Sequence, residues 1–219
     1  MRLKSYLCGN GRAESVVVIA DQPTKTTRYA AKELVWHVER ATGVTLSILS
    51  ESDLPVETHT RVYLGDTEMT RHLLDPDRLP PEAYMMRSVG NDLFIVGKED
   101  QGDPLDQRNP QVGTLFGVYE FLENVLGVHW LWPGKLGTQV PKTETIEIWR
   151  ANKTKSPALG FRSFYWGQMQ GFANGTQTLG VEDARLGFSP EGASRYGKAL
   201  AVLLRRHQMG GLAAKPPSL

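Results

Sequence analysis

Several carboxylate groups in this 219-residue chain have a spacing that could do chemistry. Glu120 and Glu123 stand three residues apart on an expected helix and share one face of it. Hydrolysis of a glycosidic bond needs two carboxyl groups about 5–9.5 Å apart on either side of a sugar, whereas a helix-surface pair is normally solvated. Glu182 and Asp183 in a glycine-rich segment, and the acids of residues 100–106, are likewise expected to be solvated. We therefore assign no catalytic residue.

The residue types that bind metals and nucleotides lack the spacing of a site. The five histidines show no metal-ligand spacing, and residues 100–106 lack the regular oxygen ligands of a calcium loop. The single cysteine, Cys8, excludes an internal disulfide and a cysteine-based zinc cage, and we expect it to be buried or incidental. Gly9-Asn-Gly11 lacks the third glycine of a dinucleotide fingerprint. The sequence thus predicts neither a metal nor a cofactor.

Tryptophans are the residues that could stack on sugar rings, whose C–H faces suit aromatic surfaces. Trp130 and Trp132 alternate on one expected strand and should point to one side, with one of them in the core. Trp166, near the end of a later expected strand, is the best candidate for a substrate-facing aromatic. Arg162, on the same strand, is the second expected substrate-binding residue.

Composition is that of an ordinary soluble globular protein, with 40% apolar and 22% charged residues. A net charge of +1 gives no field that would attract nucleic acid or an anionic membrane, so we expect neither as a partner. The N-terminus has two basic residues but not the apolar run of a signal peptide, and no run approaches the about 18 apolar residues of a membrane span. As written, the chain is expected to be cytoplasmic or to lack its export signal.

A strand–helix–strand unit is expected first. Residues 16–20 form a β-branched run, and Thr26 or Thr27 is a plausible helix N-cap. The helix that follows should face the core with apolar residues at three- and four-residue spacing and end at Gly43. Its expected core residues are Ala30, Leu34, Val38 and Ala41. Residues 44–49 then alternate as a half-buried strand does.

The elements that follow complete a mixed sheet. We expect a strand at 61–65, a short helix at 67–74, a hairpin of 83–89 and 93–97, a helix at 112–126 and a strand near 145–149. The spacing Gly113-x-x-x-Gly117 predicts close approach of the 112–126 helix to the sheet. Residues 1–150 are thus an expected domain, and residues 151–157 an expected linker. Residues 158–219 offer one strand, near 160–166, and one helix, near 193–209, which cannot bury their own faces.

Several segments resemble, in order, the N-terminal domain of bacterial alpha-glucuronidases, over about residues 15–165. The most specific are Gly113-Thr-Leu-Phe-Gly-Val-Tyr-Glu-Phe-Leu-Glu123 and Leu126-Gly-Val-His-Trp-Leu-Trp-Pro-Gly134. The same domain is similar to the one that precedes the catalytic barrel of beta-hexosaminidases. The chain departs from the pattern at His129, where relatives more usually carry arginine.

The resemblance implies an α+β fold, a mixed β-sheet with helices packed on it, followed by a (β/α)8 barrel that holds the catalytic carboxylates. A barrel takes about 250 residues, so only its first strand and helix would fit within residues 158–219. None of the family's catalytic acids has a matching position in this chain.

Three hypotheses about function remain open. The first is a non-catalytic N-terminal part of a glycoside-hydrolase-like protein of carbohydrate metabolism, whose barrel would hydrolyse glycosidic bonds, with carbohydrate as the partner. The second is a stand-alone carbohydrate-binding or interaction module without enzymatic activity, supported by the aromatic residues around 161–172. The third is a remnant of a frameshifted gene with no present function.

Overall fold

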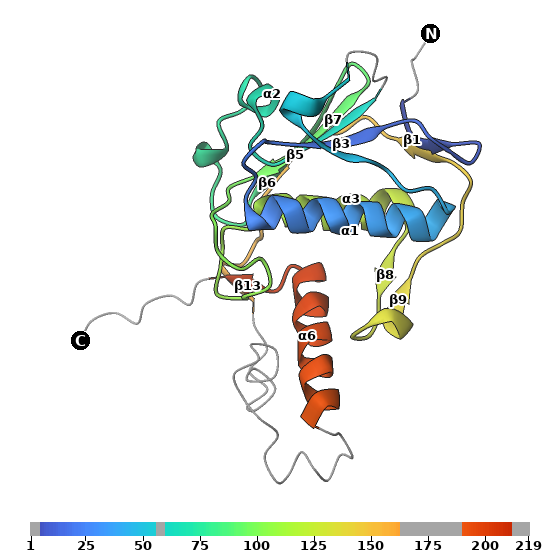
Figure 1. The fold of residues 1–219 in the computed structure, drawn as a ribbon. Helices are drawn as coiled ribbons and strands as arrows, with labels where there is room; N and C mark the ends of the chain where they lie inside the picture. Colours follow the sequence, from blue (N-terminus) through green and yellow to red (C-terminus); the bar gives the residue numbers. More distant parts are fainter. Residues whose placement is uncertain (1–4, 56–59, 163–189, 212–219) are drawn as a thin grey trace. The chain divides into compact units, whose positions relative to one another are not determined.

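The computed structural model describes residues 5–55, 60–162 and 190–211 (Figure 1). The chain divides into two compact units, each considered by itself below. Unit 1 comprises Met1–Pro104, Pro110–Val128 and Val140–Ala158. Unit 2 comprises Leu105–Asn109, His129–Gln139 and Leu159–Leu219. The domain boundaries expected from the sequence stay a prediction.

Unit 1 is built on a six-stranded mixed sheet with the strand order β11-β6-β7-β5-β3-β4. Strand β3 pairs in parallel with β4 and β5, and β5 in parallel with β7, whereas β6 and β11 are antiparallel to their neighbours. In chain order these strands are β3 (Val16–Ile19), β4 (Ile48–Ser50), β5 (Arg61–Leu64), β6 (Tyr84–Val89), β7 (Asp92–Gly97) and β11 (Asn152–Lys155). A smaller sheet joins β10 (Ile146–Ile148), β1 (Ser5–Gly9) and β2 (Arg12–Ala13).

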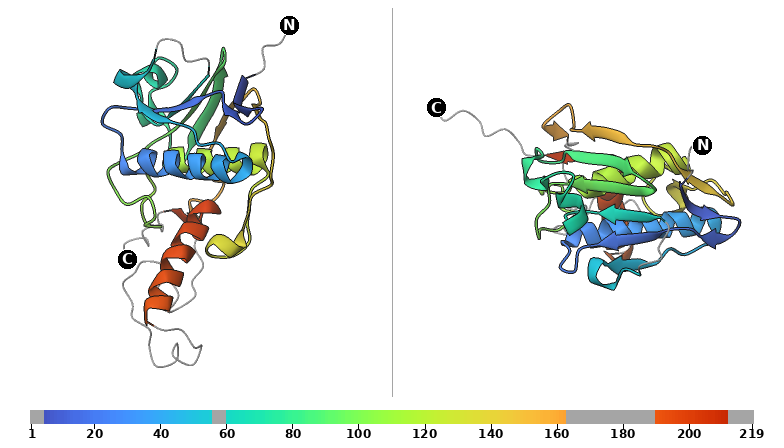
Figure 2. Two further views of the ribbon diagram at one scale, coloured as in Figure 1. Left: turned by 45° about the vertical axis from the view of Figure 1, so that its right-hand side comes forward. Right: turned by 90° about the horizontal axis from the view of Figure 1, so that it is seen from above.

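Two helices, α1 (Lys25–Thr42) and α3 (Gly113–Leu126), lie side by side along one face of the six-stranded sheet (Figures 1 and 2). Side chains alternate between the two faces of a strand. The opposite face therefore buries its own apolar cluster, which packs against Leu54, Leu73 and Leu74. The members of that cluster are Val18, Tyr63, Met85, Phe94 and Val96. The expected α+β architecture, a mixed sheet with helices packed on it, is confirmed for unit 1.

Helix α1 has the apolar stripe that its sequence predicts. Its four expected core residues are each at most 2% exposed, and Gly43 ends the helix in the left-handed region with φ of 77°. The N-cap, however, is Thr24 rather than Thr26 or Thr27, because the Thr24 hydroxyl accepts the hydrogen bond of the Thr27 amide at 2.9 Å. The buried state expected of Cys8 is also confirmed.

Glycines let helix α3 approach the sheet, as their spacing predicts. A Cβ atom at Gly113 would lie 2.1 Å from the carbonyl oxygen of Ala83, and one at Gly117 would lie 2.5 Å from the Ile95 side chain. Real Cβ atoms do not come so close, so no larger residue fits at either position without a shift of the backbone or its neighbours. The sheet edge differs from expectation. Residues 151–157, expected to be a linker, contain β11, which pairs with β6.

Unit 2 is held together at the end of helix α6 (Pro190–Arg206). The buried Arg205 guanidinium donates to the carbonyl oxygens of Asp106, of Asn109 at 2.8 Å and of Met209 at 3.2 Å. Arg206 lies over the Trp130 ring, with its guanidinium carbon 5.5 Å from the ring centroid. The end of α6 thereby fixes both the 105–109 loop and the hairpin of β8 (His129–Trp130) and β9 (Thr138–Gln139).

The expected start of a barrel is not shown by the described residues. Strand β12 (Phe161–Arg162) pairs antiparallel with β13 (Gly210–Gly211), which follows α6. Consecutive strands of a (β/α)8 barrel run parallel. Among the described residues, no helix is long and apolar enough to cross a membrane.

Candidate functional site

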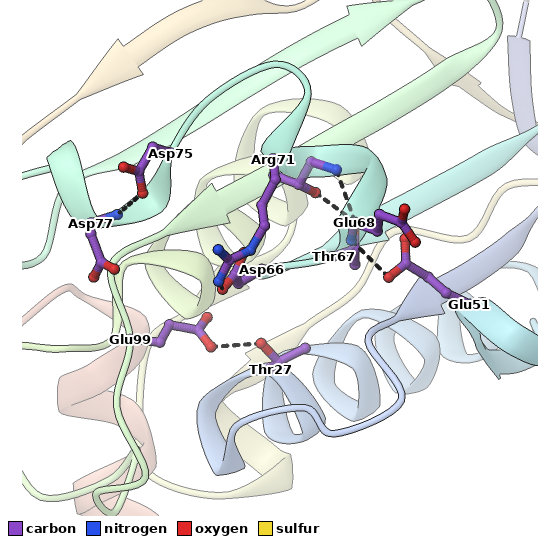
Figure 3. A network of polar contacts seen from close by, with 10 residues as sticks. Thr27, Glu51, Asp66, Thr67, Glu68, Arg71, Asp75, Asp77 and Glu99 are labelled. Carbon is purple, nitrogen blue, oxygen red and sulfur yellow. Dashed lines mark hydrogen bonds and ion pairs between the residues drawn. The ribbon is translucent and has the colours of Figure 1, made fainter.

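Polar side chains of unit 1 gather where the parallel strands end. The chain passes from β3 through α1 to β4 on one side of β3 and then crosses to β5 on its other side, so the strand order reverses at β3. In open α/β sheets, ligands bind beyond the carboxyl ends of the strands at such a switch point. Thr24 and Thr27 come from the start of α1, Asp66 follows β5 and Glu99 follows β7 (Figure 3). We call these four residues the strand-end cluster.

Glu99 is the centre of the strand-end cluster. The hydroxyls of Thr24 and Thr27 both donate to its Oε2 atom. Figure 3 shows the bond from Thr27, which is 2.6 Å long. Its Oε1 atom is buried and accepts no hydrogen bond of good geometry within the part of the chain that the structure describes. Burial raises the pKa of Glu99, and the charge of Asp66 raises it further, while the nearby threonine hydroxyls oppose the shift.

Gly65 brings β5 close to this carboxylate. Its φ of 73° lies in the left-handed region, and a Cβ atom there would lie 2.2 Å from the Thr27 hydroxyl oxygen that bonds Glu99. The end of β5, the start of α1 and the end of β7 are therefore joined at one point. This junction requires glycine at position 65, because a side chain there would collide with Thr27.

The other acids near the strand ends are engaged in local structure. Asp66 accepts a hydrogen bond from Arg71 at 2.5 Å. The carboxylate of Glu51 accepts the backbone amides of Glu68 at 2.8 Å and of Met69 at 3.2 Å, which caps the short helix α2 (Glu68–Arg71; Figure 3). No group of three or more histidine, cysteine or acidic residues suited to a metal ion occurs in the described residues.

The strand-end cluster offers one chemical group, a carboxylate that is withdrawn from water and has a raised pKa. Such a group can hold a proton and accept hydrogen bonds from hydroxyls. The hydrogen bonds that Thr24 and Thr27 donate to Glu99 fasten the start of α1 to the end of β7. Sequence reasoning missed Glu99, because it lies in a polar stretch and no sequence pattern there predicts burial.

Glu120 corrects an expectation from the sequence. It is only 6% exposed, whereas Glu123 is exposed as expected. Its carboxylate accepts hydrogen bonds from the Tyr84 hydroxyl at 2.5 Å, from Lys153 at 2.5 Å and from Lys155 at 2.8 Å. Burial acts to raise the pKa of Glu120, but these donors outweigh it and lower the pKa to about 2. Glu120 is thus an ionised acid that ties β11 and β6 to α3.

The substrate-binding residues expected from the sequence are only partly described. Arg162 donates from Nε to the carbonyl oxygen of Gln208 at 2.8 Å and from Nη1 to that of Leu159, so its guanidinium is engaged with backbone. Trp166, Glu182 and Asp183 lie outside the described residues.

Of the two neighbouring tryptophans, Trp130 lies in the core and Trp132 lies on the surface. Trp130 is 2% exposed and Trp132 is 62% exposed. One of the two is in the core, as expected, but they do not share a strand face. Strand β8 ends at Trp130, and Trp132 lies in the turn beyond it. Sequence alternation predicted a longer strand than the one observed.

Comparison with known proteins gives a likeness of fold. No family model matches the sequence, and no curated protein matches it. A family GH115 4-O-methyl-alpha-glucuronidase, with specificity for decorated arabinogalactans, matches with a TM-score of 0.57 at 16% identity. The match covers 94% of this chain and 25% of the glucuronidase, so the chain spans about a quarter of that protein's length.

Two family GH20 enzymes match more weakly. The beta-N-acetylhexosaminidase from Streptomyces coelicolor A3(2) has a TM-score of 0.41 at 13% identity, over 80% of this chain and 29% of that one. The chitobiase from Flavobacterium johnsoniae has a TM-score of 0.40 at 10% identity, over 80% of this chain and 23% of that one. The likeness to the glucuronidase therefore shows that the chain has a fold found in a glycoside hydrolase.

Proposed function

We propose that this chain is the non-catalytic N-terminal part of a glycoside-hydrolase-like protein of carbohydrate metabolism. The observation that carries the proposal is the match to the alpha-glucuronidase, which includes nearly all of this chain and only a quarter of that enzyme. In this proposal unit 1 is an accessory domain. The parent protein would supply a (β/α)8 barrel with paired carboxylates, and its ligand would be an oligo- or polysaccharide.

The contacts of three acids of unit 1 support an accessory role. Glycoside hydrolysis needs one carboxyl group that donates a proton and a second that acts as base or nucleophile, on opposite sides of a sugar. Glu120 instead faces two lysines and a tyrosine, and Asp66 faces Arg71. Glu99 is directed at the start of α1. These acids stabilise junctions of the fold.

The proposal is tested by assaying the purified 219-residue chain on aryl glycosides and on glucuronosylated oligosaccharides. We expect no turnover above a buffer blank. The variants E99Q and E120Q are assayed beside it, because turnover that one of them abolished would locate a catalytic acid in this chain. Turnover by the wild-type chain would contradict the proposal.

The second candidate is a carbohydrate-binding or interaction module that functions without a barrel. It is favoured by exposed aromatic rings, since Trp132 is 62% and Trp149 is 65% exposed. Arg162 and Trp166 remain its proposed substrate contacts. Limited proteolysis separates the candidates: a module complete in this chain resists cleavage after residue 158, whereas an accessory domain that lacks its barrel loses residues 159–219 first.

A further inference from the structure

The turn between β8 and β9 carries an exposed aromatic ring. Trp132 is 62%, Leu131 64% and Leu136 101% exposed, whereas Trp130 two residues earlier is 2% exposed. Burying an indole is worth more than burying almost any other side chain, because of its large apolar area. An exposed indole beside two exposed leucines is therefore the kind of surface that usually contacts a partner or ligand.

The turn has a defined backbone that presents this ring. The Leu131 amide donates to the Gly137 carbonyl at 2.8 Å, and the Thr138 hydroxyl donates to the Gly134 carbonyl at 3.1 Å. A Cβ atom at Gly137 would lie 2.2 Å from the carbonyl oxygen of Trp132 and 2.5 Å from its Cβ. Gly137 therefore packs directly on Trp132, and any other residue there would displace it.

Helix α6 holds the base of the same hairpin. The Arg206 guanidinium covers the Trp130 ring and donates to the Thr138 hydroxyl at 3.2 Å. A ring nitrogen of His207, Nε2, lies 2.7 Å from the Trp130 carbonyl oxygen. The hairpin is thus fixed on both strands, so the exposed ring extends from a supported base.

The hairpin that carries the ring also has exposed polar side chains and is free of negative charge. His129, Lys135 and Gln139 on the hairpin are exposed, and residues 129–139 contain no aspartate or glutamate. A pyranose ring has an apolar face of C–H groups and a rim of hydroxyls. It therefore fits an aromatic plane with hydrogen-bond donors beside it.

We propose that Trp132 is a stacking platform for a pyranose ring of an oligo- or polysaccharide, with Lys135 donating to the oxygens of that sugar. This inference deepens the proposed function and rests on it, because it names where a carbohydrate contacts this part of the protein. It places the contact in the 129–139 hairpin. A protein partner would instead cover Leu131 and Leu136 together with Trp132.

The test measures binding of the 219-residue chain by isothermal titration to two probes, a neutral arabinogalactan and one that carries uronic acids. The wild type should bind at least one probe, and W132A should bind about tenfold more weakly. L136A removes a fully exposed side chain from the same turn and should stay within about twofold of wild type. W132F should recover part of the affinity.

A second variant, G137A, tests whether binding depends on the position of the Trp132 ring as well as on its presence. G137A keeps the indole but displaces it, so its affinity should also fall while its thermal unfolding stays cooperative. Absence of binding by the wild type, or equal binding by W132A, overturns the platform. A loss in L136A as large as that in W132A also overturns it, in favour of a protein contact. Turnover in the glycosidase assay would contradict the accessory role and leave this binding result unaffected.

Discussion

Glu99 and Glu120 are two acids of unit 1 whose carboxylates are withdrawn from water, yet their proton affinities shift in opposite directions. Burial acts to raise the pKa of both. The donors around Glu99 are neutral threonine hydroxyls, and its pKa stays raised. The donors around Glu120 include two lysine ammonium groups, and its pKa falls to about 2. The charge of the partners decides whether the pKa of the buried carboxylate is raised or lowered.

The charge of the donors also determines what each acid contributes to the fold. A hydroxyl donates without a compensating positive charge, so the contact at Glu99 orients the start of α1 but leaves the carboxylate costly to ionise. An ammonium group offsets the negative charge directly, so Glu120 can bind a strand that has few apolar contacts of its own. The following changes test the contrast.

The largest effect is expected from E120A. It leaves the buried Tyr84 hydroxyl and two partly exposed lysines without their common acceptor, and hydrogen bonds to a charged group are worth up to about 3 kcal/mol. Urea unfolding of the variant and the wild type measures the loss of unfolding free energy. E123A on the exposed face of α3 is the control and should stay within about 0.5 kcal/mol. Equal losses in both variants would mean that Glu120 does not stabilise the junction.

A loss of about 2 kcal/mol is expected from G65A, which adds a Cβ atom 2.2 Å from the Thr27 hydroxyl to the strain of a positive φ. Gly90 also has a positive φ, of 59°, but nothing lies within 4 Å of its added Cβ. G90A should therefore cost only about 1 kcal/mol. The difference between their thermal midpoints measures the close approach at the strand-end cluster. Identical losses would show that this approach contributes nothing.

A smaller effect, below about 1 kcal/mol, is expected from E99Q at neutral pH, and its sign is stabilising. The pKa of Glu99 is raised by folding, so its ionisation costs stability as the pH rises from the unfolded value of about 4.3 through the folded value. Glutamine keeps the acceptor oxygen and removes that cost.

The pH dependence of the thermal midpoint tests whether the pKa values of Glu99 and Glu120 shift in opposite directions. The pKa of Glu120 is lowered by folding, so its stabilisation is complete above the unfolded pKa and is lost as the pH falls toward about 2. At neutral pH the thermal midpoint of E120Q should lie below that of the wild type, and that of E99Q should lie above it. In acid both midpoints should approach the wild-type value, E120Q from below and E99Q from above. Parallel profiles for the two variants would refute the opposite pKa shifts.

The smallest effect is expected from K155M. The Lys155 side chain is 53% exposed, so solvent screens its ion pair with Glu120 and the loss should be about 0.5 kcal/mol. K153M should cost more, because Lys153 is 36% exposed and its Nζ atom lies 2.5 Å from the same carboxylate. Urea midpoints rank the two variants. The reverse order would show that exposure does not set the strength of these pairs.

The parts of the fold predicted from the sequence are those with a periodic apolar pattern. The stripe from Ala30 to Ala41 placed α1, and the glycine pair at 113 and 117 placed the contact of α3 with the sheet, because only close packing requires such residues there. Strand β11 was missed because Asn152-Lys-Thr-Lys155 has no apolar residue. Its pairing depends on β6, a strand more than sixty positions earlier in the chain.

The candidate site was harder to predict than the fold. Helical spacing showed that Glu120 and Glu123 share a face, but only the position of β11 separates the buried acid from the exposed one. Glu99 lies in a polar stretch, and its surroundings come from the start of α1 and the end of β5. For Trp130 and Trp132, alternation was informative up to the residue where β8 ends. Contacts distant in sequence decide each of these cases.

Strand β11 has a consequence for the behaviour of the protein at high concentration. It occupies the outer edge of the sheet with lysines at positions 153 and 155, and charged edges discourage pairing with another molecule. If β11 detached, β6 would become the edge and would offer Tyr84-Met-Met86, which is now buried. A run of that kind on an open edge is a template for intermolecular sheets. The ion pairs of Glu120 therefore protect solubility as well as stability.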